Sequence, residues 1–376
     1  MEFRYCAYLR ESSYNVLKYN ESERRIMDEQ SQTRSRKLDH VRIVLDENVA
    51  AKGISTGFAA WRMPHEALPD LDMAQIDLST SFLGKRLSAP LLISSMTGGA
   101  QDVTIINTVL AEAAQHLGLA MGVGSQRAAI GDAGLAASYR VRHIAPDITL
   151  FANLGAVQLN YGFGIDECLR AVDMIRADAL ILHLNPLQEA VQPEGNTDFR
   201  GLLPKIGAVC RALPVPVIVK EVGNGISAAT ARRLVDVGVA AIDVAGAGGT
   251  SWSEVERFRH DSAARSARTA GAFADWGIPT STAIRHVRGA LPHIPLIGSG
   301  GIRSGSDVAK AIALGADLVG TAKPALIAAV DSRGVTQVIA ELQGFLDELR
   351  VAMFCSGCGD IAALQRITME RTDHDA

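Results

Sequence analysis

The sequence predicts an α/β fold, a (β/α)8 barrel, and three observations support this class. From residue 89 onward, eight short apolar runs alternate with helix-patterned segments over about 235 residues, which is the size of such a barrel. The runs are apolar on both faces, as parallel strands covered by helices must be. Polar or glycine-rich residues follow nearly every run, and only a closed ring gathers all of these ends over one mouth. A doubly wound open sheet is the alternative.

The expected elements follow one another in a regular order. The segments between the strands carry apolar residues at helical spacing, and several end in a glycine at a C′ position. A polar, proline-containing lead-in precedes the barrel over 34–88, and a terminal helix over 335–354 is expected to pack on it. We see no internal repeat beyond the βα rhythm. The expected strands cover 90–96, 119–124, 148–154, 179–184, 216–222, 241–246, 295–300 and 318–322, and the C′ glycines are Gly118, Gly238 and Gly315.

Composition limits the classes of partner and compartment. The chain of 376 residues is 48% hydrophobic and 21% charged, which is typical of globular proteins. A net charge of −4 gives no electrostatic reason to expect nucleic acid or an anionic membrane surface. No apolar run approaches the ~20 residues of a membrane span, and the first residues lack the apolar core of a signal peptide. We therefore expect a cytoplasmic protein.

We expect two parts in this chain, of which only the second carries chemistry. Residues 1–34 predict a polar, disordered extension, with Met27 as an alternative start, and residues 35–376 predict a single barrel domain. The five cysteines do not form a disulfide framework. Cys355 and Cys358, in the sequence CSGC, are expected to be two reduced thiols near the terminal helix.

The glycine-rich segment GSGGIRSG, at the end of the seventh strand, predicts a phosphate site. Gly300 and Gly301 let backbone N–H groups approach an anion closely, Ser306 or Asp307 opens the next helix, and Arg303 lies nearby. The loop after the eighth strand, at 320–322, completes the pattern, because these two loops are where barrels of this class usually hold phosphate.

A mononucleotide such as FMN suits this phosphate site better than a dinucleotide or a nucleoside triphosphate. GVGSQR, at 122–127, lacks the third glycine of a dinucleotide fingerprint, and no P-loop sequence occurs. Lys220 ends the fifth strand, where a fixed cation would stabilise the anionic reduced flavin ring. Glu221, next to it, is interpreted as a partner that points the other way.

Two further polar clusters follow from the residue types alone. SRKLDH, at 35–40, places Arg36, Lys37 and His40 within five residues, and Arg127 can complete an anion site there, although most such runs are solvated surface. The fourth strand runs into LHLNPLQEAVQPEG, whose polar side chains exceed what a turn requires.

In this order, RKLDH, SSMTGG, GSQR, FANLG, HLNPLQEAVQPEG, VIVKEVGNGIS, GAGGTSW and GSGGIRSG resemble the type II isopentenyl-diphosphate isomerases. The resemblance runs from Arg36 to about residue 365, and HLNPLQEAVQPEG is highly specific to that family. It implies an FMN-containing barrel that depends on reduced flavin and Mg²⁺ and interconverts isopentenyl and dimethylallyl diphosphate. It also implies NADPH as the flavin reductant and a homo-oligomer, either a tetramer or an octamer.

The resemblance also implies a role for each matching residue. The diphosphate of the substrate would contact Arg36, Lys37, His40, Ser125, Gln126, Arg127 and Gln188. The flavin would be lined by Ser95, Met96, Thr97, Ser125, Asn153, Lys220 and Thr250, and its phosphate end by Gly301, Ile302, Arg303, Ala322 and Lys323. The catalytic cluster facing the substrate would be His183, Asn185 and Gln188, with Glu189 as the Mg²⁺ ligand. Asn196 departs from the family, which often has Asp there, so a charged role at that position is in doubt.

Elementary acid–base chemistry agrees with a flavin in this role. Moving a proton along an allylic alkene needs a donor and an acceptor, and neither Gln188 nor Asn185 titrates at neutral pH. We therefore expect the reduced flavin to move the protons, and Glu189 to supply a hard oxygen ligand to Mg²⁺.

Three rival functions fit the sequence less well. A 2-hydroxy-acid oxidase needs a His base and an Arg clamp where this chain has GAGGTSW, and a dehydrogenase of the inosinate type needs a cysteine that 246–252 lacks. A non-catalytic flavin-binding protein would be expected to have lost the residue pairs Arg36–Lys37 and Gln188–Glu189, and both are present.

Overall fold

The computed structural model describes residues 39–99, 104–260 and 264–372. Within them the eight expected strands form one closed barrel of parallel neighbours, in the order β10-β11-β4-β5-β6-β7-β8-β9. The barrel prediction is confirmed, and the open doubly wound sheet is wrong. The hydrogen-bonded strands are shorter than the predicted apolar runs: β4 Leu91–Ile93, β5 Ala120–Gly122, β6 Leu150–Gly155, β7 Ala179–His183, β8 Val217–Lys220, β9 Ala241–Asp243, β10 Leu296–Ser299 and β11 Leu318–Thr321.

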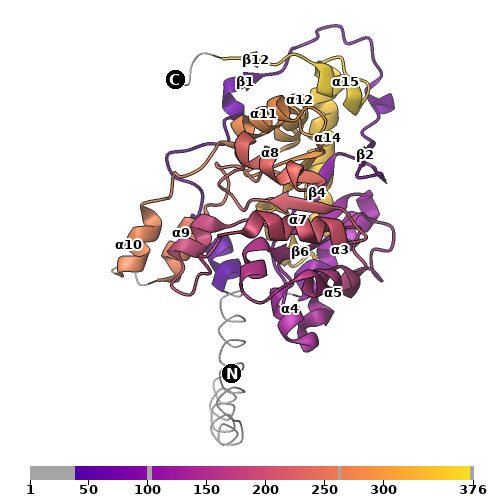
Figure 1. Cartoon of the computed structure of the whole chain (residues 1–376). Coiled ribbons are helices and arrows are strands. Elements are labelled where there is room, and N and C mark those ends of the chain that lie inside the picture. The colour runs from indigo at the N-terminus through magenta and orange to yellow at the C-terminus, as the bar shows by residue number, and fades with distance from the viewer. Residues whose placement is uncertain (1–38, 100–103, 261–263, 373–376) are drawn as a thin grey trace, which may run out of the picture.

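Helices surround the barrel because each carries one apolar face. The larger ones are α3 Thr104–Leu117, α5 Ile165–Ile175, α7 Leu202–Ala212, α8 Ala228–Asp236, α11 Thr280–Ala290 and α12 Gly305–Ala313. Positive φ angles at Gly118, Gly238 and Gly315 confirm the predicted C′ glycines. The expected terminal helix is α14 Val335–Cys355, which packs on α12 and α3 (Figure 1).

The lead-in before the barrel contains a β-hairpin that its polar composition does not predict. Its strands β2 Thr80–Phe82 and β3 Lys85–Leu87 form a hairpin, and Leu83 and Gly84 turn it with positive φ angles, as a two-residue hairpin loop requires. Phe82 and Leu87 are buried with Phe151 and other interior side chains of the barrel. The hairpin therefore closes the barrel interior at the end opposite the polar strand exits.

Residues 39–51 lie over the end of the barrel where the polar strand exits are. Residues 39–46 are helical, and residues 49–51 then run beside the loop that follows β9. Backbone bonds join Ala51 N to Gly249 O and Ser251 N to Val49 O, both at 2.9 Å. This segment thus becomes one wall of the strand-exit mouth.

Short helices fill the loops on that mouth. They include α4 Arg127–Gly131, α6 Pro186–Val191, α9 Trp252–Arg259, α10 Arg265–Gly271 and α13 Lys323–Val330, of which α10 packs on α9 and projects from the barrel (Figure 1). At the periphery, β1 Trp61–Arg62 pairs with β12 Glu370–Arg371.

The described residues agree with two exclusions drawn from composition. None of their helices combines the length and apolar character needed to span a bilayer. Their four cysteines are all free, Cys355 and Cys358 at the end of α14 included.

Candidate functional site

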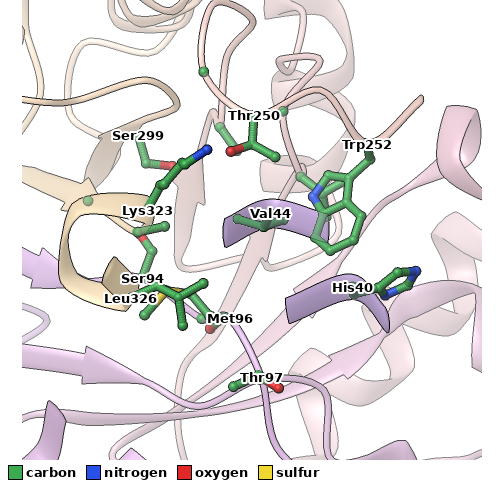
Figure 2. Close-up of a pocket in the computed structure, with 18 of the residues that line it drawn as sticks. His40, Val44, Ser94, Met96, Thr97, Thr250, Trp252, Ser299, Lys323 and Leu326 are labelled. Atoms are coloured by element: carbon green, nitrogen blue, oxygen red, sulfur yellow. The ribbon is translucent and has the colours of Figure 1, made fainter. Parts of the chain in front are cut away.

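A cavity of about 790 Å³ opens where the carboxyl ends of the eight barrel strands meet. Every strand exit contributes to its wall, and the helical segment 39–46 contributes His40 and Val44 from the amino-terminal side (Figure 2). Closed barrels place their reactive groups in this region, because only the strand exits point side chains at a shared centre.

The cavity brings together nearly all of the residues that the sequence singled out. Arg36 and Lys37 lie outside the described residues, so their positions stay predictions. The predicted residues that line the cavity are His40, Ser95, Met96, Thr97, Ser125, Arg127, Asn153, His183, Asn185, Gln188, Glu189, Lys220, Thr250, Gly301, Ile302, Arg303, Ala322 and Lys323.

Gln126 is the exception, because its side chain does not line the cavity, and its predicted substrate contact stays a prediction. Its side chain is fully buried and is absent from the cavity wall. The amide donates to Ala171 O at 2.8 Å and accepts from Asn153 N at 2.9 Å. Gln126 therefore ties the loop after β5 to β6 and α5, while its neighbour Arg127 lines the cavity.

The predicted phosphate site needs one correction. Helix α12 begins at Gly305, capped by Ser304, rather than at Ser306 or Asp307. Two of its first N–H groups are already occupied, because Gly305 N donates to Glu348 Oε2 at 2.6 Å and Asp307 N to Ser304 Oγ at 3.1 Å. The anion-binding end is thus better assigned to the loop before α12 and to the start of α13.

The charges at that end of the cavity favour an anion. Arg303 and Lys323 both line it, and burial, then the charge of Arg303, lower the pKa of Lys323. An anion between them would relieve this repulsion. Close packing alone explains the glycine at 300, since a Cβ there would lie 2.2 Å from Gly246 O.

On the floor of the cavity, Lys220 lies between two polar neighbours. Its Nζ donates to Glu221 O at 2.6 Å and lies 3.9 Å from Asp243 Oδ2. On the adjacent strand, His183 Nδ1 is 2.8 Å from Asn153 Oδ1, so Nδ1 carries the proton and Nε2 is left as an acceptor. Burial, then the charge of Lys220, lower the pKa of His183 to about 4, so this ring is neutral at pH 7.

Glu221 points away from the cavity, as its sequence interpretation held. Its Oε2 accepts from the backbone N–H groups of Val222, Gly223, Asn224 and Gly225. Burial raises the pKa of this carboxyl to about 7, against the bonds from Asn224, Gly223 and Val222, which favour the charged form. Glu221 therefore organises the loop after β8.

The polar cluster after β7 is a continuous hydrogen-bond network. Asn185 Nδ2 donates to Gln188 Oε1 at 3.1 Å and to Glu189 Oε1 at 2.9 Å. Gln188 Nε2 in turn donates to Glu256 Oε1 at 3.3 Å. These bonds fix the orientation of the Gln188 amide, with its oxygen toward Asn185 and its nitrogen toward the Glu256 carboxylate.

Glu256 joins this network and was not predicted from the sequence. It is fully buried, and its Oε1 also accepts from His40 Nε2 at 3.0 Å and Gln192 Nε2 at 2.9 Å. Arg259 donates to Oε2 at 2.5 Å. Burial raises its pKa, but the bonds and charges of His40 and Arg259 outweigh it and lower the pKa overall. The available signal was its spacing of four from Trp252, which puts both on one helical face.

Glu189 is held between two donors at the edge of the network. Its Oε1 accepts from Asn185 and its Oε2 from Asn196 N at 2.5 Å. The side-chain oxygen of Asn196 accepts from Arg127 at 3.3 Å and Gln158 at 3.0 Å. Asn196 thus serves as a neutral bridge between Arg127 and Glu189.

No group of three or more His, Cys, Asp or Glu side chains suited to hold a metal ion occurs in the part of the chain that the structure describes. A single carboxylate is nevertheless a normal protein contribution to a Mg²⁺ site, because Mg²⁺ keeps several waters and takes phosphate oxygens from a substrate. Glu189 can serve in this way.

Comparison with known proteins is consistent with this geometry. The sequence profile of the FMN-dependent dehydrogenase family matches residues 192–371. An isopentenyl-diphosphate delta-isomerase of Stutzerimonas stutzeri is 58% identical over 335 residues, covering 88% of this chain and 95% of that protein. One from a Nostoc species is 55% identical over 335 residues, covering 89% and 95%, and one from Xanthobacter autotrophicus is 54% identical over 350 residues, covering 92% and 100%.

Solved structures resemble this chain at the level of the fold. A lactate oxidase of Pediococcus acidilactici is 17% identical with a TM-score of 0.66, covering 93% of this chain and 95% of that one. A mandelate oxidase is 19% identical with a TM-score of 0.60, covering 85% and 90%. At this identity the likeness extends to the barrel and not to the reaction.

Proposed function

This chain belongs to the FMN-dependent, type II isopentenyl-diphosphate delta-isomerases, and from this premise we propose that it uses reduced FMN and Mg²⁺ to interconvert isopentenyl and dimethylallyl diphosphate. In the forward direction one proton is added to the terminal methylene carbon of isopentenyl diphosphate. Another proton is removed from the allylic carbon that is bonded to the diphosphate-bearing carbon. The double bond moves inward, and no electrons are gained or lost overall.

The cavity residues fit a bound FMN. Arg303 and Lys323 stand at one end for a phosphate, and Lys220 stands on the floor for the ring. The hydroxyl oxygens of Ser94 and Ser95 and the amide oxygen of Asn185 are buried with no hydrogen-bond partner in the described part of the chain. Buried polar atoms are rarely left unpaired, so these three favour a polar guest.

The observation that carries the proposal is the network of Asn185, Gln188 and Glu256. Its two amides cannot titrate at neutral pH, the His183 ring beside it is neutral, and Glu256 is held charged by its partners. These groups orient a substrate and exclude water, but they contain no acid–base pair poised near pH 7. Reduced FMN, when bound, would supply ring nitrogens that give and take protons.

Another part of the cavity wall suits the diphosphate of the substrate. Arg127 and His40 line it, and Arg36 and Lys37 precede His40 in the chain. Glu189 would help to hold Mg²⁺, which would offset the negative charge of the diphosphate, with Asn185 and Asn196 holding the carboxylate in place. We further propose NADPH as the flavin reductant, a homo-oligomeric assembly as a tetramer or octamer, and a cytoplasmic location.

The test is an assay of the purified protein with FMN, NADPH, Mg²⁺ and isopentenyl diphosphate under anaerobic conditions. The expected product is dimethylallyl diphosphate, and omission of FMN or Mg²⁺ should abolish it. Heat-denatured protein should also release a yellow chromophore with the mass of FMN. Activity that is retained after complete removal of flavin would refute the proposal.

A further inference from the structure

A row of three ionisable side chains crosses the cavity floor on adjacent strands. The strand register places His183 beside Lys220, and Lys220 beside Asp243. Lys220 lines the cavity, whereas Asp243 is fully buried beneath it and is not part of the wall formed by the described residues. Any influence of Asp243 on a bound ligand is therefore exerted from behind Lys220.

The two carboxylate oxygens of Asp243 have different surroundings. Oδ1 accepts from Ser299 Oγ at 2.6 Å and from Ala245 N at 3.2 Å. Oδ2 is buried and accepts no hydrogen bond from the described residues, but it lies 3.9 Å from Lys220 Nζ. A buried carboxylate oxygen without a donor is costly unless an opposite charge compensates it. Burial raises the pKa of Asp243, whereas the charge of Lys220 and the bonds from Ser299 and Ala245 favour its charged form.

Asp243 in turn compensates the positive charge of Lys220. The Nζ of Lys220 has one close acceptor, Glu221 O at 2.6 Å, and the neutral His183 on the other side offers no negative charge. Asp243 is the carboxylate that forms an ion pair with Lys220 within the described residues. The ammonium group is thus held from below, with its remaining N–H groups free to face a ligand above.

We propose that Asp243 is a positioning residue for Lys220: its buried carboxylate fixes the ammonium group on the cavity floor and offsets part of its charge, and so sets how strongly the site prefers reduced over oxidised FMN. This inference rests on the proposed function. Fully reduced flavin carries a negative charge on its ring, which Lys220 stabilises. The charge of Asp243 weakens that stabilisation, so removing it increases the preference for the reduced form.

Asp243→Asn tests this directly, because it keeps the shape and removes the charge. The measurement is the ratio of the dissociation constants of oxidised and reduced FMN, or the midpoint potential of bound FMN, under anaerobic conditions. We expect the ratio to rise about tenfold, which for a two-electron couple raises the potential by about 30 mV. The matched control is Asp317→Asn, which removes an ion-paired aspartate just before β11 and should shift the ratio by less than about threefold.

The role of Lys220 is isolated by repeating the substitution in Lys220→Met. In that background Asp243→Asn should leave the ratio unchanged, whereas an equal shift in both backgrounds would mean that Asp243 acts without Lys220 and would overturn the proposal. No shift in either background would overturn it too.

If Asp243→Asn alone does not fold, the thermal unfolding of two apoprotein variants that carry Lys220→Met tests the proposal instead. Lys220→Met leaves an uncompensated buried carboxylate, so the Lys220→Met/Asp243→Asn double variant should have a higher apparent Tm than Lys220→Met. An equal or lower Tm would contradict the pairing. Protein that binds no FMN would overturn both the inference and the proposed function. Protein that binds FMN and isomerises substrate, with no shift on Asp243→Asn, would overturn the inference alone.

Discussion

At the scale of single residues, Glu256 determines how the polar cluster is oriented. The three side-chain donors to its Oε1, Gln192, Gln188 and His40, lie 64, 68 and 216 positions away in the sequence. Residue types and local spacing therefore predicted Gln188 and His40 but not the carboxylate that joins them. The inward direction of the Gln126 side chain was not predictable for a related reason, because the direction of one side chain at a strand exit depends on what packs behind it.

Glu256→Gln should lower kcat roughly ten- to a hundredfold with KM changed less than threefold. It removes a charged acceptor shared by several donors, each such bond being worth about 1.5–3 kcal/mol, and the Gln188 amide then loses its fixed orientation. Steady-state kinetics on the fully reduced enzyme measure the change. The control is Glu254→Gln on the same helix, whose carboxylate binds Arg257 outside the cavity wall. Equal losses in both variants would assign Glu256 to folding alone.

Lys37 and Glu189 should differ in their response to metal. Lys37→Ala, outside the described residues, removes a predicted cation facing the diphosphate, so KM should rise roughly ten- to a hundredfold and extra Mg²⁺ should not repair it. Glu189→Gln keeps its shape but loses a hard anionic ligand, so its defect should shrink as Mg²⁺ is raised. A Mg²⁺ titration of both variants measures this. Rescue of Lys37→Ala with no rescue of Glu189→Gln would refute the metal assignment.

At the scale of elements, two arginine clamps fix the starts of strands four positions apart in the barrel. Arg142 donates to Ile148 O at 2.7 Å and to Asp178 Oδ2 at 2.8 Å, and Asp178 also accepts from the first residue of β6. Arg288 makes the same set of bonds before β10 and β11. Both arginines precede their strand by eight residues, with Pro at the fourth and Ile at the sixth position. This repeat is not apparent from the sequence alone, because the shared positions are few and are separated by unlike residues.

Arg142→Ala should reduce the free energy of unfolding by roughly 2–4 kcal/mol, because it removes the arginine partner of the partly buried Asp178 and the donor to several backbone carbonyls. Urea unfolding of the apoprotein measures this loss, and FMN affinity should be unchanged, since the clamp lies at the end of the barrel opposite the cavity. Arg333→Ala, in an exposed pair with Asp331, is the control and should leave the unfolding midpoint in place. A midpoint for Arg142→Ala that matches this control would contradict the clamp.

The hairpin of β2 and β3 marks the limit of element prediction. Its strands are three residues each and mostly exposed, so no periodic pattern announces them. Only Phe82 and Leu87 turn inward, and their burial depends on an interior that other strands build. In contrast, the eight barrel strands were predictable because each is buried on both faces and reads as an apolar run.

At the scale of the whole molecule, closure of the barrel explains why the site could be predicted in outline from the sequence. A parallel barrel brings every strand exit to one mouth, so residues spread from Ser95 to Lys323 line one cavity (Figure 2). Closure of the barrel does not predict which side chains outside the cavity wall hold the lining side chains in place. Glu256, Asp243 and Asn196 act in this way, and only the packed structure reveals them.

We expect this enzyme to move protons with no net oxidation or reduction of its substrate, and the ratio of product formed to NADPH consumed tests this most directly. The enzyme is reduced anaerobically with one equivalent of NADPH per bound FMN and then given excess isopentenyl diphosphate and Mg²⁺. We expect many molecules of dimethylallyl diphosphate per NADPH consumed, and no product from the oxidised enzyme. One NADPH consumed for each product molecule, or equal activity of the oxidised enzyme, would contradict the account.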